Sequence, residues 1–149
     1  MKSCKNCNLK KAVKMMVRNY KEVDLAFYDE KNGIEGDYAV DDKGDFALTN
    51  EYESARQDMA NRIRTQKTDW RSHQNLGADL ELLEGEPNTR ETGMRGESQI
   101  YEALTSDGRF NIEDVNVRAV PTSIEKIEFF STLDTDVNGL IVLTKPVDL

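Results

Sequence analysis

The sequence predicts an α+β domain in which two helices pack on a small antiparallel sheet. Three observations favour this fold class: helical spacing of apolar residues in two segments between residues 51 and 106, period-two spacing after residue 110, and the hairpin dipeptide Asn138-Gly139. Helices followed by strands are typical of an α+β arrangement. The 149 residues are enough for one domain with one core.

The first helix is predicted over residues 51–66. Asn50 and Glu53 form a capping-box pattern, in which the two side chains satisfy backbone N–H groups at the helix start. One face is apolar and the other carries arginines: Tyr52, Ala55, Met59, Ala60 and Ile63 against Arg56, Arg62 and Arg64. Cations in the last turns suit the helix dipole. Because the arginines lie opposite the apolar residues, we also expect them on the face away from the core.

A connector over residues 69–88 is expected to set the angle between this helix and the next. It contains a turn at Leu76-Gly77, a short apolar piece over residues 80–83, and the tetrapeptide Gly85-Glu86-Pro87-Asn88. Pro87 has no backbone N–H and disfavours helical geometry at the residue before it, so a helix or strand ends there.

The second helix is predicted over residues 89–106, with Ser106-Asp107-Gly108 closing it. Its buried face is expected to hold Met94, Ile100, Tyr101 and Leu104. Gly93 and Gly96 lie in its first turns, where each glycine lowers helix stability by about 1 kcal/mol.

Three strands are predicted after this helix, as an antiparallel meander that ends in a β-hairpin. The first includes Phe110, Ile112, Val115 and Val117, the second lies within residues 124–133, and the third includes residues 140–143. The segment 139–144 is apolar and free of proline until Pro146. Its backbone edge is therefore a candidate template for a strand from another chain.

The charge is unevenly distributed along the chain. The formal net charge is −8, yet residues 1–21 hold seven basic residues and no acid, so the remainder holds 13 basic and 28 acidic residues, a balance of −15. The acidic body disfavours nucleic acid as a ligand. The sequence contains no run of 18 apolar residues, so it predicts no membrane-spanning helix. The basic segment also lacks the Trp and Phe that are typical of helices lying on membranes.

Three regions are predicted: a basic arm over residues 1–28, an acidic loop over 29–45, and a folded domain over 46–149. Within the arm, apolar residues follow the spacing of an amphipathic helix: Leu9, Ala12, Val13, Met16, Val17 and Tyr20. This stripe packs either on its own domain, or on a helical bundle or acidic surface of other subunits. The acidic loop is expected to be solvated, with a short extended piece at 38–40, and its acids do not match a calcium-loop pattern.

The sequence favours no catalytic or cofactor site. Cys4 and Cys7 are weak candidates for metal ligands, because a closed zinc site needs four ligands and the one histidine, His73, is far away in sequence. We therefore predict two thiols near a terminus, unless a second chain completes a site, and we expect no cofactor.

The enzymatic alternative is a cell-wall glycoside hydrolase that uses a pair of carboxylates. Its candidates are Asp79, Glu84 and Glu86, but 28 acids in 149 residues make such neighbours common. Glu86 is better explained by an ion pair with Arg90 or Arg109. Clearing of bacterial cell wall in a zymogram, abolished by Glu86→Gln, would identify the hydrolase.

Residues 45–118 carry several motifs in a fixed order: D-F-A-L, a helix ending R-x-R-T, T-D-W-R, N-L-G-A-D-L, E-G-E-P-N, E-A-L-x-x-D-x-R-F and I-E-D-V-N-V. This order resembles the small baseplate wedge-subunit family of contractile phage tails and type VI secretion systems, historically called lysozyme-like. The matching elements include Arg64-Thr65, Gly77 and residues 86–88. Thr68-Asp69 departs from the usual Gly-Glu, no aromatic residue precedes Gly77, and the arm has no counterpart.

The resemblance implies a structural role in the tail baseplate of a virion, assembled in the host cytoplasm, without catalysis. The implied partners are larger wedge proteins, other baseplate and tail subunits, and the tail sheath protein, whose first ring adds strands to the sheet; nucleic acid and membrane are not expected. The predicted partner-binding residues lie in the arm, the connector and the last strand: Leu9, Val13, Met16, Val17, Tyr20, Glu86, Pro87, Asn88, Leu140, Ile141, Val142 and Leu143.

Overall fold

The structure, a computed structural model, describes residues 20–27, 38–50, 52–135 and 139–149. Its main elements are helix α2 (Glu53–Arg64), the 3-10 helix η1 (Leu80–Leu83), helix α3 (Arg90–Thr105), and strands β1 (Val115–Ser123), β2 (Lys126–Asp134) and β3 (Leu140–Asp148). The strands form an antiparallel sheet in the order β1-β2-β3. The predicted α+β fold is thus confirmed for these residues, whereas residues 1–19 of the predicted arm lie outside them.

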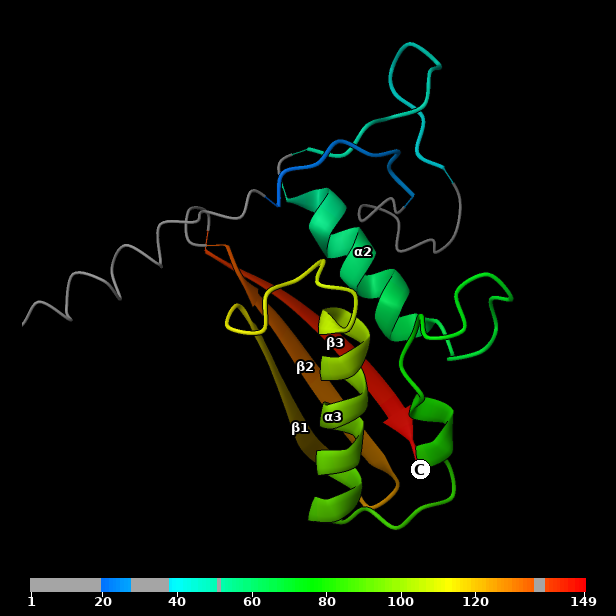
Figure 1. Ribbon diagram of the computed structural model, residues 1–149, viewed down its shortest axis with the longest axis vertical. Coiled ribbons are helices and arrows are strands. Elements are labelled where there is room, and N and C mark those ends of the chain that lie inside the picture. The colour runs from blue at the N-terminus through cyan, green and yellow to red at the C-terminus, as the bar shows by residue number, and fades with distance from the viewer. Residues whose placement is uncertain (1–19, 28–37, 51, 136–138) are drawn as a thin grey trace, which may run out of the picture.

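Helices cover one face of this sheet. In Figure 1, α3 lies across the sheet and α2 lies beyond its β3 side. Along β2, the side chains of Ile127, Phe129, Ser131 and Leu133 are buried on the helical side. Because side chains alternate along a strand, the even-numbered side chains of β2 point to the other face, which no helix of the described residues covers.

Helix α3 approaches β2 closely because Gly96 has no side chain. A β-carbon at this position would lie 2.2 Å from Cζ of Phe129, whose ring is fully buried. Thr89 is the N-cap of this helix, and its side chain accepts a hydrogen bond from the backbone N–H of Thr92. Gly108, with φ of +74°, follows the end of the helix. The predicted range is confirmed within one residue at each end.

Two helical side chains differ from their predicted placement. Met94, predicted to be buried, is 57% exposed. The line of contact between α3 and the sheet runs through Gly93 and Gly96, which turns Met94 outward. Arg62, predicted on the exposed face of α2, is only 8% exposed, because carboxylates from both helical regions surround its guanidinium.

Helix α2 spans Glu53–Arg64, a shorter range than the predicted 51–66. Half of the predicted capping box is present: Oε2 of Glu53 accepts a hydrogen bond from the backbone N–H of Asn50 at 2.6 Å. The N-cap position is occupied by Tyr52, and no side chain caps the helix there.

The predicted connector between the helices is confirmed as a turn followed by η1. Gly77 has φ of +109°, and a β-carbon there would lie 2.2 Å from the carbonyl oxygen of Thr65. Only glycine therefore fits this crossing of the chain. In η1, Leu80 and Leu83 are buried, while Leu82 is exposed.

The strands begin later than predicted. The backbone N–H of Asp114 donates to the carbonyl of Asn111 (3.1 Å), so a turn separates Phe110 from β1, which starts at Val115. Ile124, predicted in the second strand, lies in the β1–β2 turn and is exposed. The alternation of apolar residues therefore predicted starts that are too early for both strands, because turns occupy residues 111–114 and the link between β1 and β2.

Residues 20–27 and 38–50 form a small layer on α2 (Figure 1). Antiparallel bridges join Leu25 to Leu48 and Val40 to Phe46, so the predicted extended piece at 38–40 is confirmed. These bridges cross the predicted boundaries of the arm and the loop, whose residues 28–37 lie outside the described part. None of the helices in that part is long and apolar enough to cross a membrane.

Candidate functional site

The outer edge of β3 is the first candidate for a partner-binding site. The backbone N–H of Thr135 donates to the carbonyl of Gly139 (3.2 Å), and that of Leu149 donates to Glu125 (2.8 Å). Both pairs continue the register of β2 and β3. Because hydrogen-bonded pairs alternate along an antiparallel ladder, odd-numbered residues of β3 bond to β2 and even-numbered residues point their N–H and C=O outward.

Three consecutive outward positions of β3 carry backbone N–H groups: Leu140, Val142 and Thr144. The next outward position is Pro146. Proline has no backbone N–H, and because this position faces away from β2, the ladder between β2 and β3 loses no hydrogen bond there. Among the hydrogen bonds between described residues, none reaches the outward N–H groups of these three residues. They form a row of donors and acceptors about 7 Å apart, the spacing that a paired strand requires.

The β1 edge is a poorer template. The N–H of Asp134 donates to the carbonyl of Asp114 (2.8 Å), so the odd-numbered residues of β1 face outward. At these positions, Ala119 donates its N–H to Oε1 of Glu97 on α3 (2.7 Å), and Pro121 has no N–H. Helix α3 and a proline thus interrupt this edge, which leaves β3 as the favoured site for strand addition.

The four predicted residues of β3 divide between the two faces of the sheet. Leu140 and Val142 are exposed on the open face, whereas Ile141 and Leu143 are half-buried against the core. A strand paired to β3 would lie beside Leu140 and Val142, while the other two side chains stabilise the domain.

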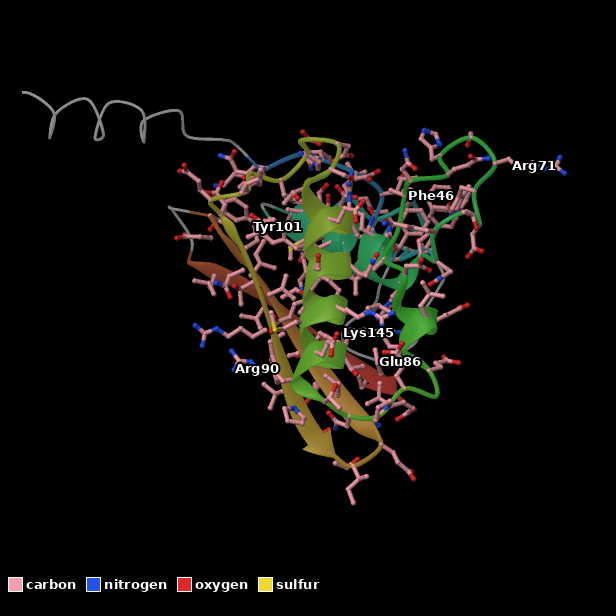
Figure 2. All side chains as sticks on the ribbon, turned by 60° about the horizontal axis from the view of Figure 1, so that its bottom comes forward. Phe46, Arg71, Glu86, Arg90, Tyr101 and Lys145 are labelled. Carbon is pink, nitrogen blue, oxygen red and sulfur yellow. The ribbon has the colours of Figure 1, made fainter. Side chains whose placement is uncertain are left out.

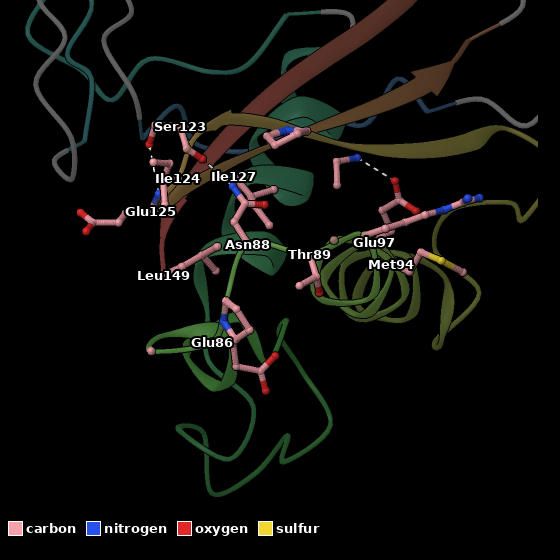
Figure 3. Close-up of a pocket in the computed structure, with 16 residues that line it drawn as sticks. Glu86, Asn88, Thr89, Met94, Glu97, Ser123, Ile124, Glu125, Ile127 and Leu149 are labelled. Atoms are coloured by element: carbon pink, nitrogen blue, oxygen red, sulfur yellow. Dashed lines mark hydrogen bonds between the residues drawn. The ribbon is translucent and has the colours of Figure 1, made fainter.

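An open groove of about 1200 Å³ is the second candidate (Figure 3). Residues 86–88, the first turns of α3, the β1–β2 turn and Leu149 line it. Met94 and Ile124 contribute exposed apolar surface, and Glu125 adds a carboxylate. The groove thus brings the predicted connector residues beside two apolar side chains from other elements.

Glu86 is paired within the chain. Its two carboxylate oxygens accept hydrogen bonds from Nη1 of Arg95 at 2.6 and 2.8 Å. Neither Arg90 nor Arg109, the predicted partners, makes this ion pair. Arg109 is directed elsewhere, to Asp58 at 3.1 Å.

The neighbouring connector residues fasten α3 to the β1–β2 turn. The carbonyl of Pro87 accepts a hydrogen bond from the hydroxyl of Thr92 (2.7 Å). The amide nitrogen of Asn88 donates to the carbonyls of Ser123 (2.5 Å) and Lys126 (3.3 Å), as Figure 3 shows for Ser123. Residues predicted to contact partners thus also hold the walls of the groove together.

Tyr20 lies in the core of its own chain. It is 3% exposed, its ring centroid is 5.8 Å from that of Phe110, and its hydroxyl donates to Oδ2 of Asp114 at 2.6 Å. This packing replaces the predicted role of Tyr20 in partner binding. The other predicted residues of the arm lie outside the described part: Leu9, Val13, Met16 and Val17.

A network of ion pairs joins α2, the end of α3 and the segment 20–27. Arg62 contacts Asp58 at 2.8 Å and Asp107 at 2.7 Å. Arg109 contacts the second oxygen of Asp58 at 3.1 Å and Glu22 at 2.9 Å. Of these side chains only Arg62 is buried, and its charge is compensated by two carboxylates.

The network shifts the pKa of two of its members. Burial lowers the pKa of Arg62, but the hydrogen bonds and charges of Asp107 and Asp58 outweigh burial, so its pKa lies above its ordinary value. Burial raises the pKa of Asp107, but the hydrogen bonds from Arg62 and from the backbone of Arg109 outweigh it, so its pKa lies below its ordinary value. Both side chains are therefore charged at neutral pH.

The acids considered for hydrolysis occupy different settings. Glu86 is paired with α3, Asp79 accepts a side-chain hydrogen bond, and Glu84 is exposed. Among described residues, no group of three His, Cys, Asp or Glu could hold a metal ion. Cys4 and Cys7 lie outside those residues.

No protein-family model matches the chain, and no curated protein matches it significantly. The fold and surfaces define a small α+β domain with a one-sided three-stranded sheet. Its two candidate docking surfaces are the β3 edge and the groove at the start of α3.

Sequence reasoning missed two surface features. Glu97 seals part of the β1 edge, and no local pattern could link it to Ala119, 22 residues away. A layer of exposed apolar residues near Phe46 was also missed, although a signal exists. Large side chains alternate with alanine or polar residues in the segments 23–27, 38–40 and 46–48, which is the period of a strand with two different faces.

Proposed function

We propose that this chain is a structural subunit of a phage-tail baseplate, similar to the small wedge subunits of contractile injection systems. It joins larger wedge proteins and templates the first ring of tail sheath protein by accepting a strand at β3. Its place is the baseplate of the virion, after assembly in the host cytoplasm. It acts through binding alone, without catalysis or a cofactor.

One observation supports this function most directly: the outward backbone groups of Leu140, Val142 and Thr144. An unprotected strand edge in an antiparallel sheet promotes aggregation of a free monomer, whereas in an assembly it provides main-chain hydrogen bonds for a partner strand. The sealing of the β1 edge by Glu97 and Pro121 leaves one direction for growth.

The groove at the start of α3 fits the second contact in the proposal, with the larger wedge proteins. Its exposed side chains, Met94 and Ile124, offer apolar surface beside Glu86 and Asn88, which are hydrogen-bonded within the chain, and beside the exposed carboxylate of Glu125. A partner seated there would bury apolar area and would present a basic group to Glu125.

Val142→Pro tests strand addition at β3. Proline at this outward position removes an N–H that bonds to nothing in β2, as Pro146 does further along the strand. We expect the domain to fold, and binding of the tail sheath protein to weaken at least about tenfold, because one backbone hydrogen bond is lost and the ring obstructs the partner. Val142→Thr, which keeps the N–H, is the matched control.

The measurement is co-purification of the full chain with sheath protein, together with thermal melting of each variant. Sheath binding that persists in a folded Val142→Pro variant would rule out the β3 edge. Separately, the wild-type chain should co-sediment with tail particles at a fixed ratio to other baseplate proteins, and its absence from washed particles would refute the baseplate assignment.

A further inference from the structure

The small layer formed by residues 20–27 and 38–50 presents large apolar side chains on one face. The bridges Leu25–Leu48 and Val40–Phe46 place these pairs side by side, and Phe27 stacks near Tyr38 (4.5 Å), which lies near Phe46 (5.2 Å). Side chains two positions apart in an extended segment share a face. We call the following set the apolar face: Val23, Leu25, Phe27, Tyr38, Val40, Phe46 and Leu48.

The opposite face of this layer is built from small residues and packs on α2. Ala26, Ala39 and Ala47 are half-buried and bonded to one another through their backbones, at 2.8 to 2.9 Å. Gln57 of α2 accepts the N–H of Phe27 (2.9 Å) and donates to the carbonyl of Leu25 (3.0 Å). The layer is therefore held to the domain by backbone hydrogen bonds and alanine contacts, with its largest side chains outward.

This outward orientation leaves several large apolar side chains of the layer exposed. Val40 and Phe46 are each 61% exposed, and Val23, Tyr38 and Leu48 are also exposed. Figure 2 shows Phe46 at the end of the molecule opposite the β1–β2 turn, far from the groove. Contiguous apolar patches of this kind on a domain are typical of interaction sites.

The charges around the apolar face are mostly negative. Asp24, Asp41, Asp42 and Asp45 are exposed in the same segments, against a single exposed Lys43 in the 38–50 segment. A partner that fits this surface presents an apolar stripe flanked by basic residues. The chain itself contains such a segment, because residues 9–18 combine the stripe of the predicted arm helix with Lys10, Lys11, Lys14 and Arg18 and carry no acid.

We propose that the apolar face binds the arm, residues 9–18, of a second copy of this chain. The apolar residues of the arm pack on the three neighbouring rings of Phe27, Tyr38 and Phe46. These arm residues are Leu9, Val13, Met16 and Val17. The basic side chains of the arm lie beside the exposed aspartates that surround the apolar face. The interface is heterologous, because the arm of one copy meets the face of the next, so it propagates unless a ring closes. This inference is independent of the baseplate proposal, which concerns β3.

The position of Tyr20 favours a second copy over the same chain. Tyr20 packs on Phe110, on the core side of the segment 20–27, while the apolar face points the other way. Tyr20 thus fastens the start of the segment 20–27 to the core, and the apolar face is assigned to the arm of another copy. The mixing experiment below decides between that arm and the arm of the same chain.

Complementation between two defective variants tests the proposal. Phe46→Ser removes the aromatic centre of the face, and Val13→Glu with Val17→Glu places carboxylates in the stripe. We expect the reduced wild-type chain to self-associate with rising concentration in sedimentation velocity, less so at high salt. Each variant alone should associate at least about tenfold more weakly. Their mixture should form a one-to-one dimer, because one intact arm and one intact face remain.

Ile112→Ser is the matched control, because Ile112 is exposed but lies outside the apolar face; it should associate as the wild type does. A wild-type chain that stays monomeric at all concentrations overturns the proposal, and so does a mixture that stays monomeric while the wild type associates. Association that survives in the arm variant indicates face-to-face pairing and also overturns it. Circular dichroism of each variant checks that the fold is retained. If Phe46→Ser unfolds, two charge variants replace it: one carries Lys10→Glu and Lys14→Glu in the arm, and the other carries Asp42→Lys and Asp45→Lys beside the apolar face. Each of these should associate weakly alone, and mixing them should restore association.

Discussion

Replacing Gly96 with alanine should destabilise the domain, although alanine is the better helix former. Helix propensity alone predicts a gain of about 1 kcal/mol, because glycine in a helix interior loses more backbone entropy on folding. The structure predicts the opposite sign. The new β-carbon would lie 2.2 Å from Cζ and 2.5 Å from Cε1 of Phe129, and 2.9 Å from Cδ1 of Leu83.

Neither neighbour has room to retreat, since Phe129 and Leu83 are fully buried in the core. Carbon atoms are in favourable contact at about 3.5–4 Å, so α3 must move away from β2 or the ring must leave its preferred rotamer. Overpacking of this kind costs roughly 1–3 kcal/mol. Set against the propensity gain of about 1 kcal/mol, the expected net loss in the free energy of unfolding is roughly 0–2 kcal/mol. The upper part of this range is expected, because the approach of 2.2 Å is to the ring of a fully buried side chain.

Gly93→Ala is the matched comparison on the same helix. Its β-carbon would lie 3.3 Å from that of Ala119, a contact that a shift of a few tenths of an ångström relieves. We expect this variant to be as stable as the wild type or slightly more stable. Urea unfolding at constant pH measures both, and Phe129→Leu should restore part of the loss in Gly96→Ala. A Gly96→Ala variant at least as stable as the wild type would refute the close-approach reasoning.

Three further changes test the polar contacts of the core. The pKa of Asp107 lies below its ordinary value when the chain is folded, so its contribution to stability is present at neutral pH and is lost as pH falls through the acid range. Asp107→Asn should therefore flatten the decline of stability below about pH 4 in urea unfolding, and an unchanged decline would contradict this. Asn88→Ala should lower stability by about 1 kcal/mol and speed amide exchange in the β1–β2 turn, because two carbonyls lose their donor; exchange faster only elsewhere would count against it. Tyr20→Phe removes the donor to Asp114 and should cost about 1 kcal/mol by thermal melting, whereas no change would place that bond outside the core's stability.

Local patterns were sufficient for the elements whose cause is local. The helix over residues 90–105 follows from its apolar spacing and from the glycine after its end. The antiparallel pairing of β2 with β3 follows from the period of the two strands and from the predicted hairpin between them, whose residues 136–138 lie outside the described part. In both cases the chain's own neighbours determine the backbone geometry, so a single sequence contains the information.

Placement of side chains relative to other elements could not be predicted in the same way. Met94 fits the apolar period of its helix, but the glycines at 93 and 96 draw a different line of the helix onto the sheet. The sequence predicts that Arg62 faces solvent. In the structure, Asp107 at the end of α3 lies 2.7 Å from Arg62 and pairs with it. Both outcomes depend on contacts between residues distant in sequence.

The sequence by itself determined the fold class, the range of α3, the antiparallel hairpin arrangement of the last two strands, and the contrast between a basic arm and an acidic body. Only the tertiary structure decided which edge of the sheet is unpaired within the described residues. The reason is that this depends on Glu97 reaching Ala119, and on whether Pro121 and Pro146 occupy outward or inward positions of their ladders. It also decided that Tyr20 belongs to the core and that Phe46 does not. Burial is a property of the surfaces that meet, and a residue's own type and spacing give only its tendency to be buried.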